Sequence, residues 1–228
     1  MQEKSVKKIL LILCVGATSF GYSQLQYSMN TFSDANGNPV VSKKVVLGES
    51  SFLYNNNYLD AVVYMPTGKP IIGNKFKLNL QENKLYYIDE TGIDMEVVSP
   101  VKRVEFGNGD DGAKVVFEKG FPPIGKLTAD NFYQVLVAGK ASLLLDTKFD
   151  VVEYKEYNSA LTTRRTDKLI TFYGVSPGGI VRISKPEDVI QLLTDKSKQV
   201  SGYMLSENSK VKKQADLEKI FRYYNSLK

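Results

Sequence analysis

The strongest constraint on the fold is a series of short segments, between residues 59 and 184, in which apolar and polar side chains alternate. The clearest segment covers residues 75–80, where Phe76, Leu78 and Leu80 alternate with polar neighbours. A side-chain period of two places successive residues on opposite faces of an extended chain. The pattern therefore predicts antiparallel strands with one face in a core and the other face in water.

Turn-forming residues separate these segments at short intervals. Residues 107–112 (Gly-Asn-Gly-Asp-Asp-Gly), Gly139 and residues 176–179 (Ser-Pro-Gly-Gly) each mark a hairpin. The other expected strands cover residues 84–89, 95–98, 101–106, 114–117, 132–137, 141–145, 151–157, 169–173 and 180–183. Short connections favour pairing between neighbours in sequence, and a flat open sheet of about ten strands leaves exposed edges. We therefore expect an antiparallel β meander rolled into a barrel-like or sandwich-like body.

The hydrophobic period changes to that of a helix after residue 184. Ser184 and Glu187 have the spacing of a capping box ahead of an apolar group at 189–193. A second short helix is expected around residues 200–204 and a third from about residue 213. The apolar stripe of the third helix consists of Leu217, Ile220, Phe221, Tyr224 and Leu227. Because two to three such stripes can cover one another, we expect helices packed on the sheet or on each other, in an α+β fold.

Residues 1–23 have the three parts of a secretory signal peptide: a basic start, an apolar run at 9–15 and a polar end. Small residues stand three and one positions before Gln24, so we expect cleavage between Ser23 and Gln24. The apolar run is far shorter than the roughly 20 residues that span a bilayer. Cys14 does not fit a lipid-attachment motif, because Leu13 directly before it is not small.

This assignment divides the chain into four parts. They are the signal peptide at 1–23, an irregular N-terminal lead at 24–51, the β body at 52–184 and the helical segment at 185–228. We expect the mature chain to be periplasmic or extracellular, with no transmembrane segment after removal of the signal. Removal of its three lysines and one glutamate lowers the formal net charge from +5 to +3, and an exported chain of that charge is not expected to bind nucleic acid.

Composition excludes several chemistries from the mature chain. It contains no histidine, and its single cysteine leaves with the signal peptide. Serine–histidine and cysteine–histidine catalysis, disulfides and the usual zinc sites are therefore excluded. We predict no catalytic residue, no cofactor and no metal site.

Three weak motifs remain. Ser99 and Lys102 fit Ser-x-x-Lys, but Pro100 lies between expected strands and residues 209–212 match equally well. The 34–38 segment has the alternate oxygen ligands of a calcium loop (Asp34, Asn36 and Asn38), but lacks the glycine and the glutamate that such a loop needs at positions six and twelve. Arg164 and Arg165 have the charge to hold an anion, although a solvated link between strands is the favoured interpretation.

The chain resembles an uncharacterised family of small secreted proteins from Bacteroidota-type Gram-negative bacteria. The resemblance rests on a Gly-Glu-Ser-Ser-Phe-Leu opening at 48–53, a Phe-Tyr-Gln-Val-Leu-Val-Ala-Gly-Lys hairpin at 132–140 and a Tyr-Tyr-Asn-Ser-Leu ending at 223–227. It implies export and a similar architecture, and it brings no established activity.

These observations favour a non-enzymatic periplasmic or surface-associated binding module for an envelope protein or another envelope component. Two alternatives stay open at this point. One is a carrier that holds a small ligand within the rolled sheet. The other is a glycan-active enzyme that uses a pair of carboxylates, although the tyrosine-rich chain has no tryptophan for a sugar-stacking platform.

Overall fold

The structure is a computed structural model that describes residues 33, 37, 39–47, 52–67, 70–107, 114–155 and 162–228. Several sequence predictions fall outside these residues. They are the signal peptide with its cleavage site at Ser23 and Gln24, Cys14, the three residues of the calcium-like pattern, and residues 108–112 of the first predicted hairpin turn.

The described residues form one antiparallel sheet of 11 strands followed by helices, which confirms the predicted α+β class. The strands are β1 (Ser42–Lys44), β2 (Leu59–Tyr64), β3 (Ile71–Asn79), β4 (Lys84–Ile88), β5 (Asp94–Val97), β6 (Arg103–Phe106), β7 (Val115–Glu118), β8 (Tyr133–Val137), β9 (Ser142–Lys155), β10 (Thr162–Ser176) and β11 (Gly179–Ile183). The helices are α1 (Pro186–Leu192), α2 (Ser197–Ser206) and α3 (Gln214–Ser226), with a 3-10 turn, η1 (Thr194–Lys196), between the first two.

The strand order is β1-β5-β4-β3-β2-β6-β7-β8-β9-β10-β11. Neighbours in sequence pair from β2 to β5 and again from β6 to β11, as a meander requires. There are two exceptions. Strand β1 pairs with β5 and not with β2, and β6 pairs with β2 and not with β5, so residues 98–102 carry the chain back to the other edge of β2. The sheet does not close, because β1 and β11 stand at its two ends, and the expected barrel-like or sandwich-like body is a curved open sheet.

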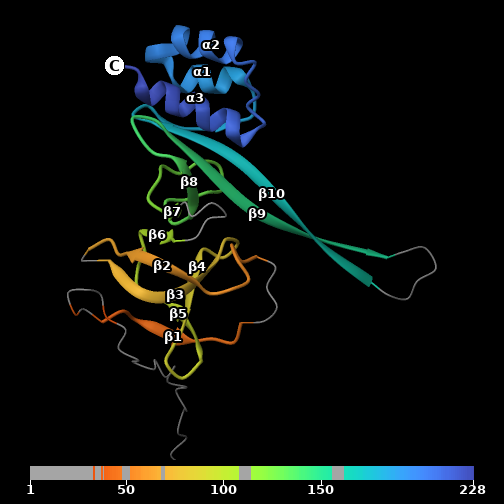
Figure 1. Ribbon diagram of the computed structural model, residues 1–228. Coiled ribbons are helices and arrows are strands. Elements are labelled where there is room, and N and C mark those ends of the chain that lie inside the picture. The colour runs from red at the N-terminus through yellow and green to blue at the C-terminus, as the bar shows by residue number, and fades with distance from the viewer. Residues whose placement is uncertain are drawn as a thin grey trace, which may run out of the picture.

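The predicted alternation is confirmed where it is clearest. In β3 the side chains of Phe76 and Leu78 are fully buried, whereas Lys75 and Lys77, which alternate with them, are not buried. These residues belong to a core cluster that strands β2–β7 enclose together with β1 and the segment before it. Figure 1 shows this curved part of the sheet at the opposite end of the molecule from the helices.

Part of the expected irregular N-terminal lead is ordered as β1. Ser42–Lys44 pairs with β5 in register, and Ser42 is buried, where its hydroxyl shares a 2.9 Å hydrogen bond with that of Tyr87. A strand of three residues is short enough to leave little exposed edge at this end of the sheet.

The prediction was wrong about the lengths of β9 and β10. We expected separate strands at 141–145, 151–157 and 169–173, with Arg164 and Arg165 in a link between them. The structure instead has two strands of 14 and 15 residues, paired from Ser142–Val175 at one end to Lys155–Thr162 at the other. Arg164 and Arg165 lie within β10, opposite Glu153 and Val152 of β9.

The three predicted helices are present (Figure 1). Helices α1 and α3 pack on one face of β8–β11, and α2 packs on α1 and α3. Four of the five residues predicted for the apolar stripe of α3 are buried: Leu217, Ile220, Phe221 and Tyr224. The fifth, Leu227, follows the last helical residue and is half-buried. Gly174 of β10 permits this packing: a Cβ atom there would lie 2.2 Å from Cδ2 of Leu192.

The predicted capping pair at the start of α1 was displaced by one residue. The acidic partner is Asp188 and not Glu187: Oδ2 of Asp188 accepts hydrogen bonds from the backbone N–H groups of Ser184 (2.8 Å) and Lys185 (2.9 Å). Because Lys185 is the residue at the helix N-cap and Pro186 begins the helix, the position three residues into the helix belongs to Asp188.

Candidate functional site

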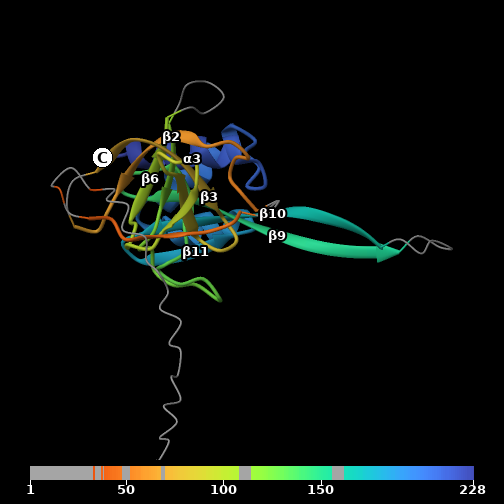
Figure 2. The ribbon, with the colours of Figure 1, turned by 90° about the horizontal axis from the view of Figure 1, so that it is seen from below.

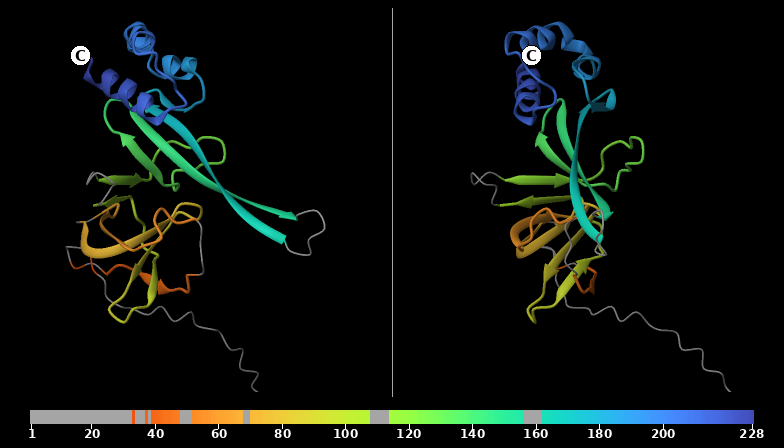
Figure 3. Two further views of the ribbon diagram at one scale, coloured as in Figure 1. Left: turned by 45° about the vertical axis from the view of Figure 1, so that its right-hand side comes forward. Right: turned by 90° about the vertical axis from the view of Figure 1, so that its right-hand side faces the viewer.

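The most distinctive surface of the molecule is the outer half of the β9–β10 hairpin. Strand β8 pairs with β9 only as far as Leu145, and β11 pairs with β10 only from Phe172 onwards. We call residues 146–155 and 162–171 the ribbon, because no third described strand pairs with them. Figures 1 and 2 and the left view of Figure 3 show the ribbon projecting sideways from the rest of the chain.

The ribbon carries exposed aliphatic side chains on both of its faces. Val151 and Ile170 share one face and are 43% and 50% exposed, while Val152 and Leu169 share the other and are 38% and 53% exposed. The polar residues between them include Lys148, Asp150, Asp167 and Lys168. Exposed aliphatic residues in a two-stranded ribbon, which is only marginally stable in water on its own, are typical of a surface that contacts another molecule.

The ribbon is held to the curved part of the sheet at one position, Phe149. The ring of Phe149 lies 5.5 Å from that of Phe52, centroid to centroid, and its backbone N–H donates a 3.2 Å hydrogen bond to Oε1 of Gln81. Residues 150–155 and 162–168 extend beyond this contact. The attachment at Phe149 therefore holds the ribbon near its base, and the outer part of the ribbon extends beyond it.

At the base of the ribbon lies a buried carboxyl group. Asp146 is 5% exposed, and burial raises its pKa above the ordinary value, although Nζ of Lys148 lies 3.8 Å from Oδ1. Burial also raises the pKa of the neighbouring Tyr133 to about 12, with smaller contributions from Tyr173 and Asp146. The upward shift in the pKa of Asp146 comes from burial, and the nearby charge of Lys148 opposes it.

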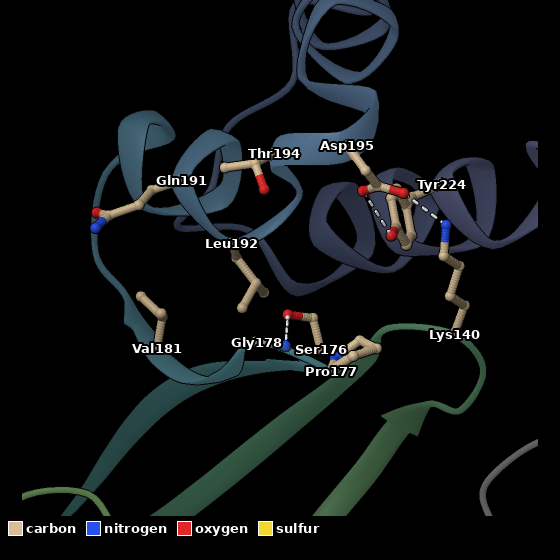
Figure 4. A pocket seen from close by; sticks show the side chains of 10 residues that line it. All are labelled: Lys140, Ser176, Pro177, Gly178, Val181, Gln191, Leu192, Thr194, Asp195 and Tyr224. Carbon is tan, nitrogen blue, oxygen red and sulfur yellow. Dashed lines mark hydrogen bonds and ion pairs between the residues drawn. The ribbon is translucent and has the colours of Figure 1, made fainter.

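A second candidate site is a pocket of about 450 Å³ between the helices and the turn after β10. Figure 4 shows its walls: the β10–β11 turn at Ser176–Gly178, helix α1 at Gln191 and Leu192, and a charged group at one end. In that group, Nζ of Lys140 lies 2.6 Å from Oδ2 of Asp195, and the hydroxyl of Tyr224 donates a 2.9 Å hydrogen bond to Oδ1.

The charged group is held together by hydrogen bonds that favour its ionised form. The hydrogen bonds from Lys140 and Tyr224 hold the pKa of Asp195 below its ordinary value, and the hydrogen bond to Asp195 raises the pKa of Lys140. Both residues are therefore ionised near neutral pH. The pocket offers hydroxyl, amide and ionic hydrogen-bonding groups to a small polar molecule.

The same region fastens the β8–β9 turn to the last helix. The side chain of Asn225 accepts a hydrogen bond from the N–H of Ala141 and donates one to its carbonyl oxygen, each 2.9 Å long. Gly139 is required by this contact, since a Cβ atom there would lie 2.4 Å from Nδ2 of Asn225. Two of the three segments on which the resemblance rests, 132–140 and 223–227, thus meet in space.

Among the described residues, Ser99, Lys102 and Arg165 from the weak sequence motifs make separate local contacts. The hydroxyl of Ser99 accepts a 2.8 Å hydrogen bond from the N–H of Val41, while the N–H of Lys102 donates to the carbonyl of Tyr64. Arg165 forms an ion pair with Asp167, Nε to Oδ1 at 2.9 Å. Within the part of the chain that the structure describes, no group of three acidic, histidine or cysteine side chains is arranged to hold a metal ion.

Sequence reasoning missed both the ribbon and the Lys140–Asp195–Tyr224 group. The ribbon has polar residues on both faces and lacks the one-sided apolar pattern that marks a strand. The charged group joins residues from three elements far apart in sequence, and no local spacing predicts it.

Comparison with known proteins adds no relative. No family model, no curated protein and no solved structure matches the chain. Among the described residues, no helix combines the length and the apolar character needed to cross a bilayer.

Proposed function

We propose that the chain is an exported, non-enzymatic binding module that engages an envelope protein or another envelope component through its ribbon. The observation that carries this proposal is the projection of paired strands beyond any third strand, with Val151, Val152, Leu169 and Ile170 exposed on their two faces. The proposal also rests on the secretory signal pattern at residues 1–23 and on the absence of histidine from the chain.

The physical reason is the cost of leaving such a surface in water. Covering a half-exposed aliphatic side chain stabilises a complex by about 1 kcal/mol, so four of them supply a useful part of a moderate affinity. A partner that covers the ribbon also shields its unpaired backbone groups, which in isolation invite aggregation.

A matched pair of variants tests the proposal. Valines 151 and 152 are both changed to glutamate in one variant, and Leu205, which is 80% exposed on α2, is changed to glutamate in the control. The tagged proteins are expressed in the native host, cross-linked in the cell and purified. We expect a stoichiometric partner with the wild type and the Leu205→Glu control, and at least a tenfold loss of that partner with the ribbon variant.

Two results would contradict the proposal. One is equal recovery of the partner by the ribbon variant when circular dichroism shows that the variant is folded. The other is reproducible turnover of an envelope glycan by the purified protein, which would replace the binding role with a catalytic one.

A further inference from the structure

The two long edges of the ribbon differ in their surroundings. The β9 edge is contacted by the chain itself, through the hydrogen bond from the N–H of Phe149 to Gln81. Along β10, no third described strand pairs with residues 162–171. Ser176 and Gly179 pair across a two-residue turn and so exchange both hydrogen bonds. Alternation along β10 then directs the backbone groups of residues 164, 166, 168 and 170 toward this unpaired edge.

The charges along β10 contain an unfavourable pair. Asp167 stands directly opposite Asp150 of β9, and like charges at opposed positions destabilise a strand pair. Arg165 relieves this repulsion in part, because its guanidinium, which is 66% exposed, forms an ion pair with Asp167. A second cation on the outer side of Asp167 would offset the repulsion further.

We propose that two copies of the chain pair antiparallel through their β10 edges, about a two-fold axis at Thr166. In this register Arg165 of each copy stands opposite Asp167 of the other, so the four side chains form a square of alternating charge. An axis shifted by one residue in either direction would place Arg165 against Arg165 or Asp167 against Asp167. The axis at Thr166 also lies at the middle of the unpaired edge, which runs from Thr162 to Thr171.

The register creates one opposed pair of like charge on each side of the axis, Arg164 against Lys168 of the second copy. Within each copy, Glu153 of β9 is the register partner of Arg164. The product is a four-stranded sheet in the order β9-β10-β10-β9, with the two bodies at opposite ends. Four strands are stable where two are marginal, and both faces of the ribbon remain available to a partner.

This inference goes beyond the proposed function and does not depend on it, because the purified protein alone decides it. Sedimentation velocity is measured over a range of concentrations for the wild type, Asp167→Lys and Lys168→Glu. Asp167→Lys places an opposite charge beside Asp150 within the monomer but a cation beside Arg165 of the second copy, so we expect a folded monomer. Lys168→Glu converts two repulsive pairs into attractive ones, and we expect a dimer dissociation constant about tenfold lower.

The register is tested by oxidation of Thr166→Cys, made in a Cys14→Ser background. At the two-fold axis the two Cα atoms lie about 5.5 Å apart, within the range that a disulfide spans. The matched control is Ile170→Cys, which in this register stands opposite Thr162 and far from its own symmetry mate. We expect a covalent dimer from the first variant only.

Three outcomes would overturn the inference. The first is that the wild type and the Lys168→Glu variant both stay monomeric at millimolar concentration. The second is that the Asp167→Lys variant dimerises as strongly as the wild type and as the exposed-charge control Glu187→Lys. The third is equal disulfide cross-linking of the variants with cysteine at positions 166 and 170. The first would leave the edge to a different partner, and the other two would place a dimer contact elsewhere.

Discussion

Replacement of Asn225 by alanine is expected to destabilise the contact between the last helix and the β8–β9 turn. Asn225 satisfies both backbone groups of Ala141, which is fully buried, through two hydrogen bonds of 2.9 Å. Loss of the side chain leaves a buried donor and a buried acceptor without these partners, at about 1–2 kcal/mol each. The free energy of unfolding is expected to fall by about 2–4 kcal/mol, which lowers the Tm by about 4–16 °C for a chain of this size.

The assay is thermal and chemical unfolding of the purified protein beside two further variants. Ser226→Ala removes an exposed hydroxyl whose 2.6 Å hydrogen bond stays within α3, and is expected to cost at most about 0.5 kcal/mol. Asn225→Asp keeps the acceptor but turns a carboxylate oxygen toward the carbonyl of Ala141, so its loss should match that of the alanine variant. A Tm for Asn225→Ala equal to that of Ser226→Ala would refute the reasoning.

Two further predictions concern single carboxylates. Asp188→Ala is expected to lower the free energy of unfolding by about 1 kcal/mol, because it removes the acceptor for the backbone N–H groups of Ser184 and Lys185. The control Glu187→Ala should change the free energy of unfolding by less than about 0.5 kcal/mol, and urea unfolding of both variants measures the difference. Asp146→Asn is expected to raise the Tm at neutral pH. Burial raises the pKa of Asp146 in the folded state, so the ionised carboxylate opposes folding above that pKa, and the advantage of asparagine should shrink as the pH falls through it. Thermal unfolding at several pH values checks this, and an advantage that grows in acid would contradict it.

The sequence was sufficient for the parts of the fold in which one face is buried. Phe76 and Leu78 in β3, and Leu217 and Phe221 in α3, mark their elements because each buried face repeats with the period of its own secondary structure. The helices were expected to pack on the sheet, and Gly174 lies where they do so.

The remaining features depend on forces that a local pattern does not record. In the ribbon, Val151 and Val152 are successive and face opposite sides, so the strand has no single apolar face, and its continuity comes from backbone pairing with β10. The pairing of β6 with β2 joins strands that are not neighbours in sequence, and the alternation within each strand does not indicate which strand lies beside it. The capping acid of α1 was misplaced because Ser184 offers the same side-chain chemistry as an N-cap residue, one position before the residue that occupies the N-cap.

The sequence predicted the kind of function, a binding module, but not the surface that carries it. Composition excluded histidine- and cysteine-dependent chemistry, which made binding the favoured role, but no residue of the ribbon was singled out apart from Arg164 and Arg165. Their expected setting in a solvated link was wrong, since both belong to a paired strand.

The most direct test of the account is site-specific photo-cross-linking in the native host. A photoreactive residue is placed at Leu169 on the ribbon, at Ile72 on the curved part of the sheet and at Leu205 on α2, which are 53%, 68% and 80% exposed. The account predicts that, of the three positions, only Leu169 gives adducts with a defined envelope component. Where two copies pair, adducts of twice the chain mass are also expected. Adducts with such a component from Ile72 or Leu205, and none from Leu169, would contradict the assignment of the ribbon as the binding surface.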